Sequence, residues 1–182
     1  MKQKLRQQII QKINLMKEEE IVKKSKKVIK KLNNLEVFKR SKNICVYISK
    51  KDEVFTHNLI QSLLKNKNVF VPYVEKDTLK ISQIKNFSDL EKGTFDIFEP
   101  KLKIEFNGKI DLVIVPGVAF DKNCGRLGRG NGYYDKFLRD KDFLKIALAF
   151  DEQILDKVPM GNHDISMDIV ITENQFFEKG AE

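Results

Sequence analysis

The sequence predicts an α/β fold, a single-domain layered sandwich with a mainly parallel sheet. Short runs of β-branched and apolar residues recur along the chain, and segments with helical spacing of apolar residues separate them. This alternation favours helices layered on a parallel sheet. A length of 182 residues suits one domain with a buried core, and no internal repeat or Gly/Ser linker divides it. We therefore expect one domain over residues 1–182.

The helices are predicted from spacing and from end signals. The first segment has apolar residues every three or four positions, at Leu5, Ile9, Ile13 and Met16. A second helix follows an acidic start, "KEEE", and buries Ile21, Ser25, Val28, Leu32 and Leu35. A third is expected over 56–66 with Thr56 as its N-cap, and a fourth from Gly132 through 133–140.

The strands are predicted from short apolar runs. They are expected over 43–48, 68–74, 109–117, 145–150 and 168–172, and the run "KIDLVIVPG" at 109–117 is the strongest signal. Residues 75–109 mix charges with short extended pieces and Pro100, so we expect irregular structure there with weak strands near 79–84 and 102–106.

The formal charge of +8 is concentrated at the start of the chain. Residues 1–42 contain 14 Lys and Arg against 4 Asp and Glu, whereas the remainder contains 20 against 22. Nucleic acid is one partner for such a segment, but the lysines alternate with apolar residues at helical spacing, which favours a solvated helix face. We expect no nucleic-acid partner, and the same field would also suit a small polyanionic substrate.

Other composition signals concern the compartment. No run approaches the roughly 20 apolar residues of a membrane span, and the first residues lack the apolar block of a secretory signal. Cys45 and Cys124 form neither a metal-ligand spacing nor a disulfide framework, so both are expected to be structural thiols. A cytoplasmic protein without a membrane partner is the expectation.

One loop concentrates glycine and positive charge. Four glycines and two arginines occupy the eight positions from Gly125 to Gly132, directly before "YYDKFL". Glycine lets backbone N–H groups approach a ligand closely, and arginine offers the forked donors that phosphate oxygens accept. A helix that starts after the loop would add a partial positive charge. The loop is therefore interpreted as an anion-binding site, although a charged surface turn is the alternative.

The residues beside the loop suggest further roles. Asp135 would either cap the following helix or hold a divalent cation against phosphates. Tyr133 and Tyr134 face different directions on a helix, so at most one of them is expected to meet the ligand. The spacing matches neither the P-loop nor a clean Rossmann fingerprint.

The segment "PGVAFDKNCGRLGRGNGYYDKFL", residues 116–138, closely resembles the signature of the 5-formyltetrahydrofolate cyclo-ligases, also called methenyltetrahydrofolate synthetases. The similarity continues in "KQKLR" at the start, in "YISKKDEVFT", in "KIALAFDEQIL" and in "VPMGNHDISMDIVITE", in the order of that family. It thus covers most of the chain. The implied fold is related to that of the sugar-phosphate isomerase and CoA-transferase group.

The resemblance implies an ATP-dependent ligase that converts 5-formyltetrahydrofolate into 5,10-methenyltetrahydrofolate with release of ADP and phosphate. In that family the formyl oxygen attacks the γ-phosphoryl group of ATP, N10 of the folate closes on the activated carbon, and phosphate leaves. Mg²⁺ is the implied metal. Positioning and charge neutralisation would supply most of the catalysis, which agrees with a chain of only two histidines. The implied protein is a monomer with small-molecule partners.

The resemblance also implies site residues. ATP contacts fall on Lys2, Gln3, Lys4, Leu5 and Arg6 and on the loop residues Arg126, Leu127, Gly128, Arg129, Gly130, Asn131, Gly132, Tyr133 and Tyr134. Folate contacts fall on Arg6, Ile48, Glu53, Arg129, Gly130, Asn131, Gly132 and Tyr133, with Glu53 bonded to the pterin. Arg129 and Tyr133 are the expected catalytic residues, and Asp135 and Asp168 the expected metal-associated acids.

Each of these assignments has a structural alternative. Ile48 suits plain core as well as a substrate wall, Asp168 a turn at a strand end, and Asp52 a solvated loop charge. Asn131 and Gly161 depart from the family pattern, where Lys or Gly and an acidic residue are usual. A nucleotide- or folate-binding module without turnover is therefore a second hypothesis, and a nucleic-acid binder that uses the basic helices is a third.

Overall fold

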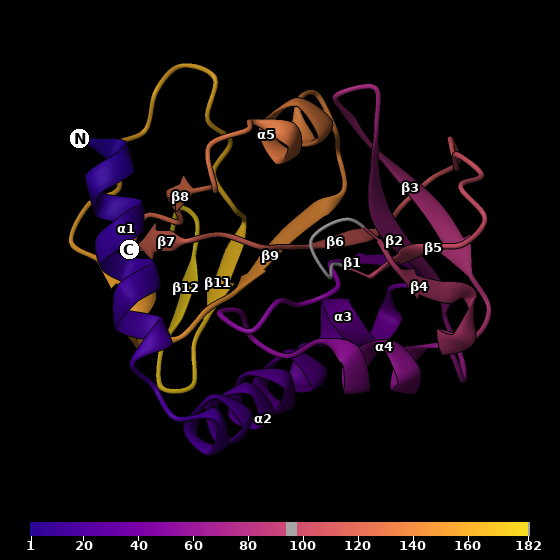
Figure 1. Cartoon of the computed structure of the whole chain (residues 1–182), viewed down its shortest axis with the longest axis horizontal. Coiled ribbons are helices and arrows are strands. Elements are labelled where there is room, and N and C mark those ends of the chain that lie inside the picture. The colour runs from indigo at the N-terminus through magenta and orange to yellow at the C-terminus, as the bar shows by residue number, and fades with distance from the viewer. Residues whose placement is uncertain (94–97, 182) are drawn as a thin grey trace.

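A seven-stranded sheet forms the centre of the protein, as seen in a computed structural model that describes residues 1–93 and 98–181 (Figure 1). Its strand order is β12-β11-β9-β6-β1-β2-β3. The strands are β1 (Asn43–Val46), β2 (Asn68–Glu75), β3 (Thr78–Ile84), β6 (Leu112–Val115), β9 (Leu144–Leu148), β11 (Ile169–Ile171) and β12 (Phe176–Glu178). Only the two edge strands, β3 and β12, pair antiparallel. The predicted mainly parallel sheet is therefore confirmed.

Helices cover both faces of this sheet. They are α1 (Lys2–Asn14), α2 (Glu18–Asn34), α3 (Glu36–Arg40), α4 (His57–Leu63) and α5 (Tyr133–Leu138), with 3₁₀ turns η1 (Phe87–Asp89) and η3 (Asp151–Gln153). In Figure 1, α2, α3 and α4 lie below the sheet, α5 lies above it, and α1 stands at its left end. No described helix is long and apolar enough to cross a membrane.

Strand side chains alternate between two cores. Ile44 and Val46 belong to the core under α1–α4, whereas Cys45 between them belongs to the core under α5. In the same way, Leu112 belongs to the first core and Val113 to the second, because successive side chains of a strand point to opposite faces of the sheet. Cys45 and Cys124 are both buried and free, as predicted.

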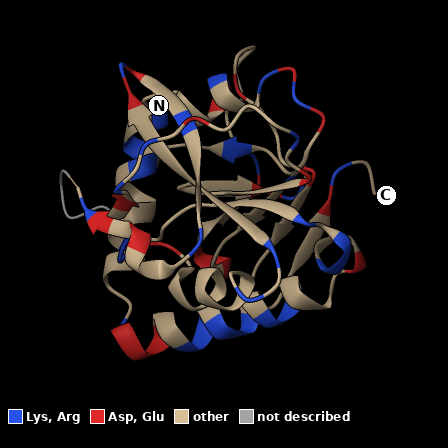
Figure 2. Ribbon diagram, turned by 90° about the vertical axis from the view of Figure 1, so that its right-hand side faces the viewer, with Lys and Arg blue, Asp and Glu red and all other residues tan. Residues whose placement is uncertain are grey.

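The second helix follows its predicted pattern closely. Its buried residues are Ile21, Ser25, Val28 and Leu32, and lysines occupy the outer face (Figure 2). Ser25 accepts a hydrogen bond from the Phe55 backbone N–H at 3.0 Å, which explains a polar residue at a core position. The arrangement fits the expected solvated face.

Smaller elements were not all predicted. A three-stranded sheet has the order β10-β7-β8, and a two-stranded sheet pairs β4 with β5. Their bounds are β4 (Leu90–Lys92), β5 (Phe98–Pro100), β7 (Ala119–Asp121), β8 (Arg126–Leu127) and β10 (Ile154–Leu155). The weak strand expected near 79–84 is β3, a full edge strand, whereas the one expected near 102–106 is wrong. Leu102 and Ile104 are 73% and 69% exposed, and this segment is held through the Ser82 hydroxyl instead of a ladder.

The N-cap prediction for α4 is right in position and wrong in mechanism. Thr56 precedes the helix, but its side chain makes no capping bond. Its hydroxyl donates to the Tyr47 carbonyl at 2.7 Å and accepts from the Ser49 backbone N–H at 3.1 Å. Thr56 therefore fixes the chain that leaves β1, which leads into the candidate site.

Candidate active site

A cavity of about 520 Å³ opens where the carboxyl ends of β1 and β6 meet. Open α/β sheets bind their ligands at this edge. The cavity has the size typical of small-molecule sites. Predicted site residues that line it are Ile48, Glu53, Arg126, Gly128, Arg129, Gly130, Asn131, Gly132, Tyr133, Tyr134 and Asp135. A larger groove of about 1130 Å³, lined partly by Arg40, Phe106 and Phe143, contains no predicted site residue.

At one corner of the cavity an arginine and a carboxylate of the lining are bonded to each other, and a second carboxylate beside the cavity binds the same arginine. Arg129 donates from Nη2 to Glu53 at 2.9 Å and to Asp52 at 2.8 Å, and from Nε to Glu53 at 3.3 Å. The Glu53 side chain is only 8% exposed. Burial alone would lower the pKa of the Arg129 guanidinium, but the two carboxylates outweigh it and raise that pKa. Asp52, interpreted from the sequence as a loop charge, is thus part of the site.

The glycine-rich loop takes the backbone shape that its composition predicts. Gly130 and Gly132 have φ of 115° and 68°, conformations that side chains disfavour, and Gly132 is the N-cap of α5. That helix has only six residues, so its dipole adds little to anion binding. Tyr133 and Tyr134 both line the cavity, and the expectation that at most one of them meets the ligand stays a prediction.

The base of the loop is fixed by Arg126. Its side chain is 3% exposed, and Nη2 donates to Asp135 at 2.7 Å while Nη1 donates to the Pro116 carbonyl at 3.2 Å. Asp135 also accepts from the Ile165 backbone N–H at 3.0 Å. The buried Nε of Arg126 has no hydrogen-bond partner among the described residues. Arg126 therefore supports the loop from beneath and retains one free donor.

The N-terminal helix contacts the opposite side of the loop. Arg6 donates from Nε to the Gly128 carbonyl at 2.7 Å, and Lys2 forms an ion pair with Asp164. None of residues 2–6 lines the cavity. The spacing of four places Lys2 and Arg6 on one face, as predicted, but only Arg6 contacts the loop, while Lys2 contacts the segment around Asp164.

The two predicted metal-associated acids are not brought together. Asp135 lines the cavity, whereas Asp168 accepts a hydrogen bond from the Lys145 backbone N–H at 2.7 Å, at the start of β9. Strand starts and strand ends lie at opposite edges of a parallel sheet, so Asp168 is remote from the carboxyl edge. No group of three or more His, Cys, Asp or Glu among the described residues could hold a metal ion.

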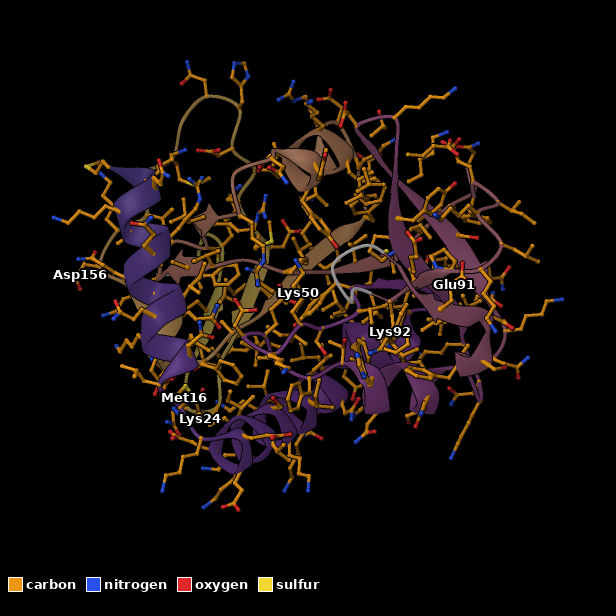
Figure 3. All side chains as sticks on the ribbon, viewed as in Figure 1. Met16, Lys24, Lys50, Glu91, Lys92 and Asp156 are labelled. Carbon is orange, nitrogen blue, oxygen red and sulfur yellow. The ribbon has the colours of Figure 1, made fainter. Side chains whose placement is uncertain are left out.

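Some contacts of the site were not assigned to residues from the sequence. The Lys50 backbone N–H donates to the second carboxylate oxygen of Glu53 at 2.9 Å, and Lys50 lies near the middle of the view in Figure 3. Asp121 shapes the turn before the loop through the Gly125 N–H at 2.9 Å. A side chain at Gly125 would meet Asp121 at 2.7 Å, which explains that glycine. Lys50 and Asp121 both lie in segments quoted for the resemblance, which was the signal that could have indicated them.

The fold and the site together define a class: an α/β protein with a small-molecule cavity, an arginine-bearing glycine loop and a buried carboxylate. Comparisons with known proteins identify the family. The model of the 5-formyltetrahydrofolate cyclo-ligase family matches residues 1–173. A 5-formyltetrahydrofolate cyclo-ligase of Mus musculus is 30% identical over 95% of this chain and 94% of its own length.

Solved structures agree with this match. The NMR structure of Aquifex aeolicus 5,10-methenyltetrahydrofolate synthetase is similar with a TM-score of 0.90 and 34% identity, over 100% of this chain and 94% of that one. A 5,10-methenyltetrahydrofolate synthetase from Mycoplasma pneumoniae has a TM-score of 0.73 and 27% identity, over 94% and 98%. The chain belongs to the 5-formyltetrahydrofolate cyclo-ligase family, enzymes of folate one-carbon metabolism. The resemblance found in the sequence is confirmed.

Proposed function

We propose that this chain converts 5-formyltetrahydrofolate into 5,10-methenyltetrahydrofolate at the expense of ATP, which is cleaved to ADP and phosphate. The observation that carries the proposal is the cavity in which a buried carboxylate, Glu53, faces the glycine-arginine loop. A carboxylate suits the amino-pyrimidine edge of a pterin, and the loop suits phosphate. The cavity and the loop beside it thus offer groups that suit both the pterin of the folate and the phosphates of ATP.

The folate is proposed to occupy the cavity itself. Ile48 is 7% exposed and, together with Pro72, Tyr73 and Phe98, gives the cavity an apolar wall. Such a wall favours the flat ring system, while Glu53 fixes its orientation. The loop residues Gly130 to Tyr133 would contact the folate from the other wall.

The nucleotide is proposed to lie against the loop on the side that α1 covers. Arg6 already contacts Gly128 there, and Lys2 pairs with Asp164 on the neighbouring segment. Both cations could turn to phosphates with little change of backbone. Gln3, Lys4 and Leu5, together with Leu127 and Asn131, remain proposed contacts on the strength of the resemblance. The loop would then border both substrates, and the terminal phosphate would extend past it into the cavity to meet the formyl oxygen directly.

The reaction needs positioning more than proton transfer. ATP supplies the phosphoryl group that turns the formyl oxygen into a leaving group. Burial raises the pKa of Tyr134 and Tyr47 well above the usual value, and the charge of Glu53 adds to the shift. Both phenols therefore stay neutral and act as donors or walls. Arg129 would neutralise charge on the transferred phosphoryl group and Tyr133 would orient the folate.

A magnesium ion would be held chiefly by the phosphates. Such sites usually need one or two carboxylates in addition to the nucleotide, and Asp135 at the cavity can provide one. Its Oδ1 is engaged with Arg126 and Ile165, which leaves Oδ2 for a ligand. Asp168, bonded to Lys145 at the other edge of the sheet, would not reach this ion.

The remaining proposals concern the whole protein. We propose a cytoplasmic monomer that consists of one domain over residues 1–182. The continuous seven-stranded sheet, to which segments from residue 43 to residue 178 contribute, supports a single unit. Sedimentation of the purified chain would test the oligomeric state.

A spectrophotometric assay tests the function. Methenyltetrahydrofolate, followed by its ultraviolet absorbance, should form only when 5-formyltetrahydrofolate, ATP and Mg²⁺ are all present. Release of phosphate should match product formation one to one. Absence of product with a correctly folded preparation would refute the proposal, and ligand binding without ATP consumption would indicate a binding module instead.

A further inference from the structure

The guanidinium of Arg129 is hydrogen-bonded to the Glu53 carboxylate, to which the pterin of the folate is expected to bind. Its Nε and Nη2 both donate to Oε1 of Glu53, at 3.3 and 2.9 Å. Oε2 of Glu53 accepts the Lys50 backbone N–H at 2.9 Å. An ionised carboxylate offers about four lone-pair sites, of which three are thus used.

A pterin cannot bind Glu53 in full while this arrangement persists. Its amino-pyrimidine edge presents two parallel donors, which need one lone pair on each carboxylate oxygen. Among the described residues, both sites of Oε1 are filled by Arg129, and Oε2 alone retains a free site. One of the two Arg129 bonds must therefore break when the folate binds.

Arg129 is the partner that can move. Its side chain is 35% exposed, whereas that of Glu53 is 8% exposed and held by the backbone of Lys50. A second carboxylate, Asp52, accepts Nη2 of Arg129 at 2.8 Å and does not line the cavity. Asp52 can keep hold of the guanidinium after Glu53 has released it.

We propose that the pterin and Arg129 exchange on Glu53, so that folate binding releases Arg129 towards the nucleotide phosphates and couples the affinities of the two substrates. Asp52 is the positioning residue that holds the guanidinium near the loop during the exchange. The inference rests on the proposed function. In this exchange Glu53 is the acceptor that the pterin and Arg129 share. The movement of Arg129 is what makes the binding of one substrate change the affinity for the other.

Coupling of this kind is reciprocal. A phosphate that draws Arg129 away uncovers Glu53 for the pterin, and the pterin that displaces Arg129 supplies a cation to the phosphate. Couplings between sites usually amount to 5–150-fold in affinity, and exchange of a single side chain places this one on the order of tenfold.

Binding measurements test the exchange without turnover. The affinity of a non-hydrolysable ATP analogue with Mg²⁺ is titrated at pH 8, with and without saturating 5-formyltetrahydrofolate. In the wild-type chain, folate should tighten nucleotide binding about tenfold. In Arg129→Ala the coupling should fall to about one, while folate alone binds at least as tightly as to wild type, because Glu53 is uncovered.

Two charge-matched variants separate the roles of the carboxylates. Glu53→Gln should bind the nucleotide analogue in the absence of folate several-fold more tightly than wild type, because a neutral amide holds Arg129 less firmly. Asp52→Asn removes the same charge next to the same guanidinium but leaves the shared acceptor, so the coupling should become weaker than in wild type, because Asp52 no longer holds the released guanidinium, without falling to one as it does in Arg129→Ala. Thermal unfolding of each variant shows whether the fold is retained.

The outcomes distinguish the exchange from the proposed function. If Arg129→Ala weakens the binding of folate alone by tenfold or more, Arg129 contacts the folate directly and the exchange is wrong. Two ligands that bind to wild type without affecting each other would also overturn the exchange, while the proposed function would stand. If neither ligand binds to the folded wild-type chain, the proposed function itself fails.

Discussion

The bond between Arg6 and the Gly128 carbonyl allows a prediction of how α1 contributes to catalysis. The 2.7 Å contact joins residues that are 122 positions apart and is made by a charged donor. The guanidinium carbon would also lie 3.5 Å from a side chain at Gly130, so it lies against the turn of the loop. Replacement by alanine removes both the bond and the cation on the proposed nucleotide side.

The magnitude follows from the value of one charged hydrogen bond. Such a bond contributes about 1.5–3 kcal/mol, and each 1.36 kcal/mol is a factor of ten, so kcat/KM for ATP should fall about 10–150-fold in Arg6→Ala. The affinity for folate alone should change less than threefold, because Arg6 does not line the cavity. Steady-state formation of methenyltetrahydrofolate with ATP varied gives the first quantity, and a folate titration gives the second.

Two further variants show whether the geometry or only the charge matters. Arg6→Lys keeps the positive charge but lacks the Nε–H donor, so an intermediate loss is expected. Lys12→Ala removes an exposed charge from the same helix and should leave kcat/KM unchanged. A loss of less than threefold in Arg6→Ala, or an equal loss in Lys12→Ala, would refute the reasoning.

The remaining predictions concern turnover, stability and pH. Arg129→Ala and Asp135→Ala should each lower kcat at least a hundredfold in the spectrophotometric assay, since each removes a charged contact at the transferred group. Lys24→Met should destabilise the fold by about 3–5 kcal/mol and lower Tm by about 6–20 °C, because it leaves the 3%-exposed Glu173 without its ion pair at 3.0 Å. Burial lowers the pKa of His57, so stability towards urea should decrease as the pH falls from 7.5 to 5.5, and His57→Phe should remove that part of the decrease.

The lowered pKa of His57 determines the direction in which stability changes with pH, and exposed residues provide the control variants. The folded chain binds fewer protons at His57 than the unfolded chain, so its contribution is present above pH 6.5 and is lost as the pH falls towards the lower folded pKa. His163 is exposed, and His163→Asn should keep the pH dependence. Lys23→Met changes an exposed neighbour of Lys24 and should shift Tm by less than about 2 °C. If His163→Asn removed the pH dependence, burial of His57 would not be its cause. If Lys23→Met lowered Tm as much as Lys24→Met, loss of the buried ion pair would not be the cause of the destabilisation.

The sheet was predictable because its signals are local. Every third or fourth residue of α2 is buried, and strands such as β6 are continuous apolar runs, so periodicity alone indicates both. The positive φ of Gly130 and Gly132 follows from their identity in the same way. Leu102 and Ile104 misled the prediction because propensity cannot tell an exposed apolar residue from a strand residue.

The contacts that complete the site were not predictable, because they join distant segments. Arg129 meets Asp52 across 77 positions, and Lys2 meets Asp164 across 162. A resemblance to a family indicates which residues belong to the site, but it does not indicate where each of them lies in the fold. For this reason Asp168 was grouped with Asp135, although one lies where strands begin and the other where they end.

The position of the loop has a consequence for the order of events in catalysis. Its inner side faces Glu53 and its outer side faces Arg6, so each substrate would contact one side of the same few residues. A shift of the loop caused by one substrate is therefore transmitted to the other without a separate hinge. Arg129 bonds the Glu53 carboxylate in the cavity, while its neighbour Gly128 bonds the helix. Chemistry should accordingly require both substrates to be in place, which would prevent the loss of ATP when folate is absent.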